Sequence, residues 1–412
     1  MGIIFHIDVN SAFLSWSALE QLSLGNPVDL RTVPSIVGGD TQTRHGIVTA
    51  KSIPAKAFGI ETAEPVVSAF KKCPGLIMVP PNHKLYSAYS QALMEHLSSF
   101  CPYIEQASID ECYMDFTPIM DNFSSPEEGA RVIKDSVYEK FGFTVNVGIS
   151  DKKVLAKMAS DFKKPNLVHT LYSHEIREKM WHLPVSRLFL CGKSATETLH
   201  KLGIRTIGEL AQFDLHVLES HMKSMGTTLW QFANGIDDSP LILEQVKAKG
   251  IGNSTTLSAD VTSPAEAHKV LLTLAESVGA RLRKHKNLAG MVTTEIKYAT
   301  FKSVSHQCSL FSPTAANDII YRTACKLFDE LWDGSPVRLL GVRCTKLTEE
   351  GDPVQMNLFD YVESIPTKSA TTSAKKEKLE KLDAALDSIR GKYGKDIIKR
   401  GSLTDSPKNK HS

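Results

Sequence analysis

What the sequence lacks already narrows the classes of protein to which it can belong. Its seven cysteines are odd in number and none forms a C-x-x-C pair, which argues against a zinc site or a disulfide framework. No apolar run approaches the length of a membrane span, and the first residues lack the charge and cleavage pattern of a signal peptide. Internal repeats are also absent. We therefore expect a chain that works in the reducing cytoplasm and makes no contact with a membrane.

Excess charge of either sign is lacking as well. Lys and Arg number 48 against 46 Asp and Glu, so the formal net charge is only +2. This balance does not indicate a nucleic-acid binder, yet a basic channel beside an acidic site gives the same total. The 412 residues, of which 42% are hydrophobic, suffice for several folded domains.

Acidic residues stand where strand-like runs end. Asp8 closes an apolar run, and the adjacent pair Asp110 and Glu111 lies between two further runs. Because strand side chains alternate between faces, two neighbouring acids converge only where the backbone turns. Two such charges about 4 Å apart cost roughly 4 kcal/mol at a surface-like dielectric, unless a cation joins them. Each acid taken alone is also explained as a solvated turn or cap, so the trio needs support from its surroundings.

The order of predicted elements indicates an α+β chain of several domains. Residues 1–166 alternate strands and helices, including a strand over Phe143–Ile149 and a helix capped by Ser150 or Asp151 that ends near Phe162. Residues 170–235 are helical and contain a partial helix-hairpin-helix, in which Leu190 or Cys191 replaces the first turn glycine. A plain helical turn explains that stretch as well.

The second half predicts a smaller domain. Residues 253–349 follow the order strand, helix, strand, strand, helix, strand, which is a split βαβ arrangement. Its first helix opens with a capping box at Ser263–Glu266, and its second is expected to open at Ser312-Pro313. Beyond it, Lys375–Arg400 predicts an amphipathic helix that docks through one apolar stripe. The stripe consists of Leu379, Leu382, Leu386, Ile389 and Tyr393.

Together these parts resemble the Y-family (DinB/UmuC-type) DNA polymerases. The motifs that carry the resemblance are Ser108-Ile109-Asp110-Glu111 after Asp8, Gly46-Ile47-Val48 leading to Ala55-Lys56-Ala57-Phe58-Gly59, and Val147-Gly148-Ile149-Ser150 leading to Lys163-Lys164-Pro165-Asn166. The resemblance runs from Met1 to about Leu347. One such motif is open to chance, but their common order and spacing is not.

The resemblance implies a right-hand polymerase fold. Its parts would be a ferredoxin-like palm at 1–10 and 77–170, small fingers at 11–76, a helical thumb with the helix-hairpin-helix at 171–238, a linker at 239–248, a βαββαβ little finger at 249–349, a clamp-binding peptide at 350–361 and a flexible tail with the amphipathic helix at 362–412. In this arrangement the loop after Asp8 would receive the incoming nucleotide.

The resemblance also assigns roles at the reaction centre. Asp8, Asp110 and Glu111, with the carbonyl of Val9, match the ligands of two Mg²⁺ ions, for which Mn²⁺ is the alternative. Two ions about 3.5–4 Å apart clamp the attacking and leaving oxygens of a phosphoryl transfer. The substrates would be deoxynucleoside triphosphates, added to the primer of a primer-template DNA.

Further positions match the family's nucleotide contacts. Phe13 matches the aromatic steric gate under the sugar, Lys164 matches a lysine that reaches the triphosphate, and Ser108 lies beside the carboxylates. Lys56 matches the basic residue of the fingers. The family's tyrosine three residues earlier is Ile53 here, and Ser52 is the candidate to replace its phosphate hydrogen bond.

The peptide Gln355-Met356-Asn357-Leu358-Phe359 resembles the motif by which bacterial polymerases bind the sliding clamp. Leu358 and Phe359 would fill an apolar pocket, while Gln355 would form a hydrogen bond at its rim.

We expect a monomer that pairs with the clamp and copies damaged DNA with low fidelity, since fingers of this size are too small to test base-pair shape. A non-catalytic accessory protein and a nucleotidyl cyclase on a related palm are the alternatives.

Overall fold

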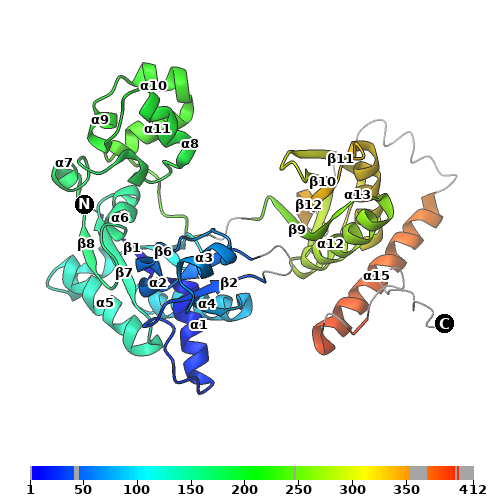
Figure 1. Ribbon diagram of the computed structural model, residues 1–412, viewed down its shortest axis with the longest axis horizontal. Coiled ribbons are helices and arrows are strands. Elements are labelled where there is room, and N and C mark those ends of the chain that lie inside the picture. Colours follow the sequence, from blue (N-terminus) through cyan, green and yellow to red (C-terminus); the bar gives the residue numbers. More distant parts are fainter. Residues whose placement is uncertain are drawn as a thin grey trace. The chain divides into compact units, whose positions relative to one another are not determined.

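The structure is a computed structural model, and its description covers residues 2–40, 46–244, 247–349, 351, 369–394 and 397–398 (Figure 1). These residues fall into two compact units, the first of which runs to residue 246, and the second begins at Lys247. Each unit is described by itself below. In the described part of the chain, no helix is both long and apolar enough to cross a membrane.

The first unit is built on a mixed sheet with strand order β5-β6-β1-β7-β8. Its strands are β1 (Ile4–Val9), β5 (Ile104–Gln106), β6 (Glu111–Asp115), β7 (Val145–Ser150) and β8 (Val168–Thr170). The central strand β1 runs antiparallel to both β6 and β7. This topology places the ends of β1 and β6 that carry Asp8 and Glu111 side by side.

Strand β1 is buried on both faces, and its two faces differ in chemistry. Phe5, Ile7 and Val9 belong to a core with helices α1 (Ala12–Ser23), α4 (His83–Ser98) and α5 (Pro126–Phe141). The alternate residues His6 and Asp8 face helix α6 (Lys153–Ser160), where they meet Ser160 and Lys157. The alternation expected of a strand thus separates apolar core from polar site.

Helix α6 lies against the sheet at very short range. A Cβ added to Gly148 of β7 would come within 2.0 Å of the Ala156 carbonyl oxygen. Glycine is therefore required at this position by the close approach of the helix. On its other side α6 shares a core with the helical region that follows, as its place in Figure 1 indicates.

Two smaller parts complete the first unit. One is a sheet of order β3-β2-β4, in which the strands are β2 (Ser35–Gly38), β3 (Val48–Lys51) and β4 (Ile77–Val79), with helices α2 (Ile53–Ala57) and α3 (Val66–Lys72). The other is helical and consists of α7 (Ile176–Lys179), α8 (Lys193–Lys201), α9 (Ile207–Ala211), α10 (Leu215–Met222) and α11 (Ser224–Ala233). Short 3₁₀ turns occupy Thr117–Asn122, Ser173–Glu175 and Val185–Arg187.

The predicted helix-hairpin-helix is only partly formed. Helix α8 follows a turn in which Leu190 has φ 65° and is 51% exposed, where a glycine was expected. The element before Leu190 is the 3₁₀ turn Val185–Arg187, where the motif would have an α-helix. An exposed leucine in the left-handed region is uncommon because its Cβ is crowded by the backbone.

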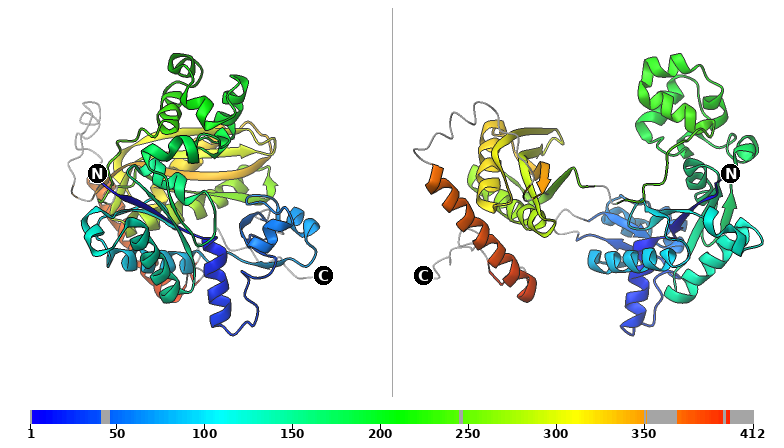
Figure 2. Two further views of the ribbon diagram at one scale, coloured as in Figure 1. Left: turned by 90° about the vertical axis from the view of Figure 1, so that its left-hand side faces the viewer. Right: turned by 180° about the vertical axis from the view of Figure 1, so that it is seen from behind.

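The second unit has the predicted order of elements, β9 (Gly250–Val261), α12 (Pro264–Lys284), β10 (Asn287–Tyr298), β11 (Ser303–Thr314), α13 (Asn317–Leu331) and β12 (Val337–Glu349). Its sheet has strand order β11-β10-β12-β9, and all neighbours are antiparallel. Helices α12 and α13 cover one face of the sheet (Figure 2). As the pattern predicted, Val292, Thr294, Ile296 and Tyr298 are buried together.

Two helix starts differ from the expectation. The strand β11 continues through Ser312-Pro313, so α13 begins only at Asn317. Helix α6 begins at Lys153, because Ser150 still belongs to β7. In both cases the capping group comes from far along the chain: Asp383 accepts the Asn317 N–H and Asp237 accepts the Val154 N–H, each at 2.8 Å.

The C-terminal helix α15 (Ser369–Tyr393) docks through a face that coincides only in part with the predicted apolar stripe. Leu382 is 52% exposed and Tyr393 63% exposed, whereas Asp383 is only 2% exposed. Asp383 accepts hydrogen bonds from the backbone and side-chain amides of Asn317, and it lies 3.6 Å from the Arg283 guanidinium. The stripe prediction was right for Leu379 and Leu386, which are half-buried at helical spacing from Asp383. It was wrong for Leu382 and Tyr393, because charged pairs with Arg283 hold much of the docking face.

Candidate active site

The site centres on two carboxylates at the ends of neighbouring strands. Asp8 of β1 is paired with Glu111 of β6 in the antiparallel register, so both side chains lie on the α6 face of the sheet. Asp8 is 5% exposed. Charged groups are rarely buried to this extent unless a counter-charge accompanies them.

Two lysines supply that counter-charge. Lys157 of α6 places Nζ 2.7 Å from Glu111 Oε1 and 3.4 Å from Asp8 Oδ2. Lys164, in the loop after α6, places Nζ 2.8 Å from Asp8 Oδ1. Asp161 lies between the lysines, 3.2 Å from one Nζ and 2.9 Å from the other. The result is a compact cluster of three carboxylates and two lysine ammonium groups.

The two carboxylates differ in proton affinity. Burial and the adjacent Glu111 raise the pKa of Asp8 to about 7, and the attraction of Lys164 and Lys157 only partly opposes this. Burial alone would also raise the pKa of Glu111, but the neighbouring His6, Asp8 and Lys157 side chains outweigh it and hold that pKa below its ordinary value. Without a bound cation, the pair therefore holds one proton below about pH 7, mainly on Asp8.

His6 lies behind this pair as a neutral residue. Its Nδ1 is 2.8 Å from Ser160 Oγ, and its Nε2 is 3.7 Å from Glu111 Oε2, beyond hydrogen-bonding distance. Burial lowers the pKa of His6, because the imidazolium form would lose its hydration. His6 therefore adds no positive charge to the cluster.

Asp110 lies at the same turn, but its carboxylate points elsewhere. Its carbonyl oxygen accepts the Val9 N–H at 3.0 Å, which ties the turn to the end of β1. Its side chain accepts a 2.7 Å hydrogen bond from the Ser108 hydroxyl. The structure therefore brings Asp8 and Glu111 together and leaves Asp110 beside them. Within the described ranges, no group of three His, Cys, Asp or Glu side chains is arranged to hold a metal ion.

The donor chemistry nevertheless fits a hard divalent cation. Asp8 and Glu111 carry neighbouring carboxylate groups, and burial penalises the negative charge of both. Oxygen donors of this kind suit Mg²⁺ or Mn²⁺. Asp110 could join them by turning away from Ser108, which it contacts through one hydrogen bond from a hydroxyl.

Phe13 lies in the first turn of α1, the helix that follows β1 and Asp8 in the chain. Its ring stacks on Tyr86 of α4 with centroids 4.5 Å apart and planes inclined by 9°. A second ring, that of Trp16, lies 6.1 Å away. Aromatic packing on this scale fixes the ring in one orientation.

The fingers candidates fall on α2 and have contrasting surroundings. Lys56 is exposed in the last turn of the helix. Ser52 is 2% exposed and caps the helix: its hydroxyl accepts the N–H groups of Ser35 and Ala55 and donates to the Val33 carbonyl. These bonds use the full capacity of a hydroxyl group. Ser52 is therefore structural here, and the expectation that it contacts a phosphate is not supported by this geometry.

Comparison with known proteins places the chain in a family. Residues 7–161 match the impB/mucB/samB family, and residues 248–358 match the impB/mucB/samB family C-terminal domain. The chain belongs to the impB/mucB/samB family. A DNA polymerase IV of Clostridium acetobutylicum is 45% identical over 98% of both chains, and one of Clostridium kluyveri is 35% identical over 99% of both.

A solved structure supports the same fold. A Y-family DNA polymerase chimera matches with a TM-score of 0.73, at 24% sequence identity, over 84% of this chain and 100% of its own. The Y-family resemblance and the multidomain polymerase fold predicted from the sequence are thereby confirmed.

Sequence reasoning missed several residues of this acidic cluster and its surroundings. Lys157, His6, Asn10 and Asn146 are all 8% exposed or less and contact the cluster or its supporting loop. A lysine inside an otherwise buried helix is an unusual signal that could have drawn attention to Lys157. The buried amides carry no comparable signal, because their partners lie far away in sequence.

Beside the site, the segment that leaves the helical region is tied to the sheet. Asp237 caps α6, and Glu105 accepts both the Ile242 N–H at 2.7 Å and the Lys153 ammonium at 2.6 Å. These contacts line a hollow of about 400 Å³ that reaches Glu111. The helix that carries Lys157 is thus held at its start by residues of the helical region's exit.

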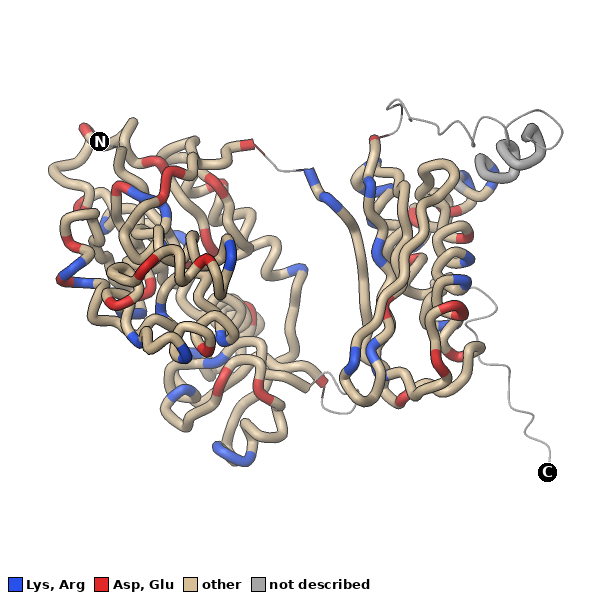
Figure 3. Tube along the Cα trace, turned by 90° about the horizontal axis from the view of Figure 1, so that it is seen from above, with Lys and Arg blue, Asp and Glu red and all other residues tan. Residues whose placement is uncertain are grey.

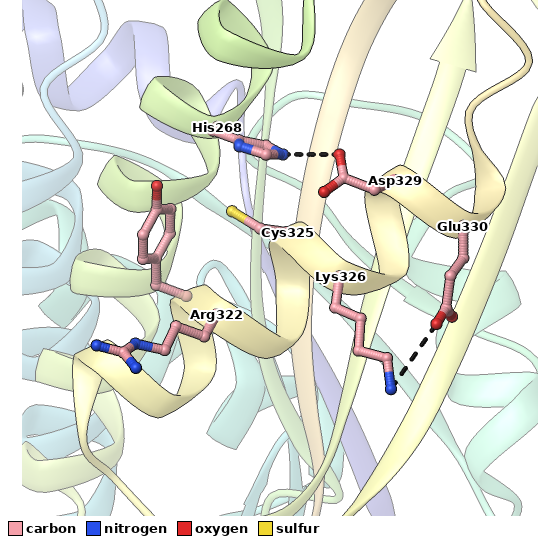
Figure 4. Close-up of a pocket in the computed structure, with 7 residues that line it drawn as sticks. His268, Arg322, Cys325, Lys326, Asp329 and Glu330 are labelled. Carbon is pink, nitrogen blue, oxygen red and sulfur yellow. Dashed lines mark hydrogen bonds and ion pairs between the residues drawn. The ribbon is translucent and has the colours of Figure 1, made fainter.

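Other charged features carry no comparable chemistry. Figure 3 shows that basic and acidic residues are interspersed in each unit. A hollow of about 510 Å³ is lined by residues of α13 and by His268 of α12. It contains two pairs, in which His268 Nε2 lies 2.8 Å from Asp329 and Lys326 Nζ lies 3.8 Å from Glu330 (Figure 4). Burial raises the pKa of the Cys325 thiol there to about 11, so it is not a reactive thiolate.

Proposed function

We propose that this chain extends a DNA primer on a template by two-metal phosphoryl transfer, with Asp8, Asp110 and Glu111 at the reaction centre. Through its family and its DNA polymerase IV relatives, the chain is a DNA-directed DNA polymerase of the translesion class, which acts in damage tolerance. The catalytic assignment rests on one observation above all: Asp8 and Glu111 face each other across β1 and β6.

The family implies dependence on a divalent metal. We propose that two Mg²⁺ ions, or Mn²⁺ in their place, bind Asp8, Asp110, Glu111 and the Val9 carbonyl. Such ions, when bound, lower the pKa of the primer 3′-hydroxyl and offset charge on the triphosphate. Phosphoryl transfer leaves the protein mainly the tasks of positioning and neutralisation.

The remaining residues orient the nucleotide in this proposal. Lys164 and Lys56 contact the phosphates, and Ser108 sets the orientation of Asp110. Phe13 lies under the sugar, where its stacked ring collides with a ribose 2′-hydroxyl. Lys157 keeps Glu111 ionised and in place, because its Nζ is 2.7 Å from that carboxylate.

The domain assignment stays a proposal too. The sheet of β5, β6, β1, β7 and β8 would be the palm (1–10 and 77–170), with fingers at 11–76 and thumb at 171–238. The little finger (249–349) would hold DNA on the sheet face opposite α12 and α13. Small fingers would leave base-pair shape weakly tested, which gives low fidelity.

The clamp-binding peptide lies outside the described residues. We propose from its sequence that Gln355, Leu358 and Phe359 bind the sliding clamp, and that the polymerase works as a monomer in the cytoplasm. Deleting residues 355–359 should abolish clamp-stimulated synthesis and spare basal primer extension. Equal loss of both activities would contradict a tethering role.

Primer extension with Mg²⁺ and deoxynucleotides tests the catalytic site. The double substitution Asp110→Ala, Glu111→Ala should abolish extension, while Asp115→Asn, at the other end of β6, should leave it near the wild-type rate. Full activity of the double variant would refute the site. A non-catalytic accessory role is not favoured, because the acidic residues are present and the relatives are polymerases.

A further inference from the structure

Two buried asparagines form the structural support of the loop that carries Lys164. Asn10 follows β1 directly and is 7% exposed, while Asn146 lies in β7 and is 0% exposed. The Asn10 Nδ2 donates to the Asn146 Oδ1 at 3.1 Å. Buried amides persist in folded proteins only when their polar groups are satisfied, so each remaining bond of the pair is informative.

Asn146 uses its whole hydrogen-bonding capacity. Its Nδ2 donates to the carbonyl oxygens of Ser160 at 3.0 Å and Lys163 at 2.7 Å. Its Oδ1 accepts the Leu167 N–H at 3.2 Å in addition to the bond from Asn10. A single side chain therefore binds the end of α6 and the loop on both sides of Lys164.

Asn10 binds the same loop from the end of β1. Its Oδ1 accepts the Asn166 N–H at 2.8 Å and the Thr144 hydroxyl at 2.9 Å. The amide pair thus binds the backbone on both sides of Lys164. Asn146 binds the carbonyl of Lys163, and Asn10 binds the N–H of Asn166. Between them the Lys164 Nζ reaches Asp8 at 2.8 Å.

The segment after α6 is irregular and leads only at Val168 into β8, so ladder hydrogen bonds do not fix residues 161–166. Side-chain contacts must supply the order that a strand or helix would provide. The amide pair meets this need with bonds to backbone groups on both sides of the lysine. Lys164 itself is partly exposed, which leaves its ammonium accessible to a ligand.

We propose that Asn10 and Asn146 are positioning residues that hold Lys164 at the nucleotide site and thereby set the affinity for the triphosphate. The inference rests on the proposed function, in which Lys164 contacts the phosphates. Neither amide is assigned a contact with the substrate: both act through the backbone around Lys164. Their loss should accordingly weaken nucleotide binding while sparing the affinity for DNA.

The test measures single-nucleotide incorporation on an undamaged primer-template as a function of deoxynucleotide concentration. Asn146→Ala should raise the nucleotide KM by about tenfold, the size expected when a positioned hydrogen-bonding charge is lost. The dissociation constant for primer-template should stay within twofold, roughly, of wild type because the change is local. The matched control is Asn234→Ala, whose amide bonds the Ala211 and Trp230 carbonyls in the helical region. It should leave the nucleotide KM unchanged.

A double-mutant cycle separates positioning from a general structural effect. Lys164→Ala should raise the KM at least as far as Asn146→Ala, and the double variant should be no worse than Lys164→Ala alone. Additive effects of the two substitutions would overturn the proposal. Asn10→Asp serves as the isosteric variant if Asn146→Ala fails to fold: it keeps the acceptor for Asn166 but cannot donate to Asn146. It should raise the KM in the same direction, and an unchanged KM would refute the role of the pair.

The outcomes also distinguish this inference from the proposed function. If wild-type protein incorporates nucleotides but Lys164→Ala has an unaltered KM, the assigned role of Lys164 is wrong, and the inference is overturned with it. If Lys164→Ala raises the KM and neither asparagine variant does, only the positioning role is overturned.

Discussion

Lys157 is the residue whose removal should reveal the electrostatics of the site most directly. The substitution Lys157→Met keeps the length of the side chain and removes its charge, leaving Asp8 and Glu111 with only Lys164 nearby. Breaking a buried ion pair by removing one partner typically costs about 3–5 kcal/mol. Because Glu111 is 26% exposed at its side chain, we expect the lower end of this range, near 3 kcal/mol, in metal-free protein.

The cost should depend on pH, with a sign set by Asp8. The folded pKa of Asp8 is about 7, above its ordinary value of 3.8, so the folded chain holds a proton that the unfolded chain has released. This contribution to stability is present at low pH and is lost as pH rises toward and through 7, at up to about 1.4 kcal/mol per pH unit. When Asp8 is neutral the cluster carries one negative charge less, so Lys157→Met should cost less at pH 5.5 than at pH 8.

Urea unfolding with EDTA at both pH values measures this difference, and a second series adds Mg²⁺. A divalent cation replaces the missing positive charge, so it should raise the unfolding midpoint more in Lys157→Met than in wild type. Lys153→Met is the control on the same helix: it breaks the pair with Glu105, at 2.6 Å, away from Asp8. Its cost should not change with Mg²⁺. A pH-independent cost for Lys157→Met, unaffected by Mg²⁺, would refute this reasoning.

Three further substitutions test separate features. Phe13→Ala should lower discrimination against ribonucleotides by at least about tenfold, since the ring that excludes the 2′-hydroxyl is gone. Parallel incorporation of both nucleotide types checks this, and unchanged sugar selectivity would identify another gate. Asp237→Ala should lower the free energy of unfolding by about 1–2 kcal/mol through loss of the α6 cap. The control is Asp238→Ala, which removes only the surface pair with Lys152 and should lower the free energy of unfolding by less than about 0.5 kcal/mol. Equal losses for the two variants in urea titrations would contradict the capping role of Asp237. Asp383→Ala should destabilise the second unit by about 2–3 kcal/mol because buried donors lose their acceptor, and an unchanged melting temperature would argue against docking of α15.

The elements that the sequence predicted well are those whose signal is local. The alternation in β1 and β10 depends on neighbouring residues, and so does the order of elements in the second unit. These features need only periodicity. The meeting of Asp8 with Glu111 was predicted from the turn at Asp110 together with the resemblance to the polymerase family, because the two residues lie far apart in the sequence.

The features that the sequence concealed depend on distant partners. The starts of α6 and α13 were misplaced because their caps are Asp237 and Asp383, and the first of these lies 83 positions along the chain from the N–H that it accepts. No local capping rule can identify such a residue. The docking face of α15 was predicted only in part for the same reason. Apolar periodicity does not reveal that Asp383 and Asp387 pair with Arg283, which lies far away in the sequence.

The six residues of β1 specify two things at once. The odd-numbered residues of β1 fill the core, and the even-numbered residues include the acid Asp8. The strand therefore tolerates no shift of register. An insertion or deletion of a single residue upstream of Asp8 within the strand would turn Ile7 toward the lysines and drive the acid among aromatic rings. Loss of catalysis and loss of folding would then arise from one and the same lesion. Evolution can therefore vary this strand by substitution, but not by length.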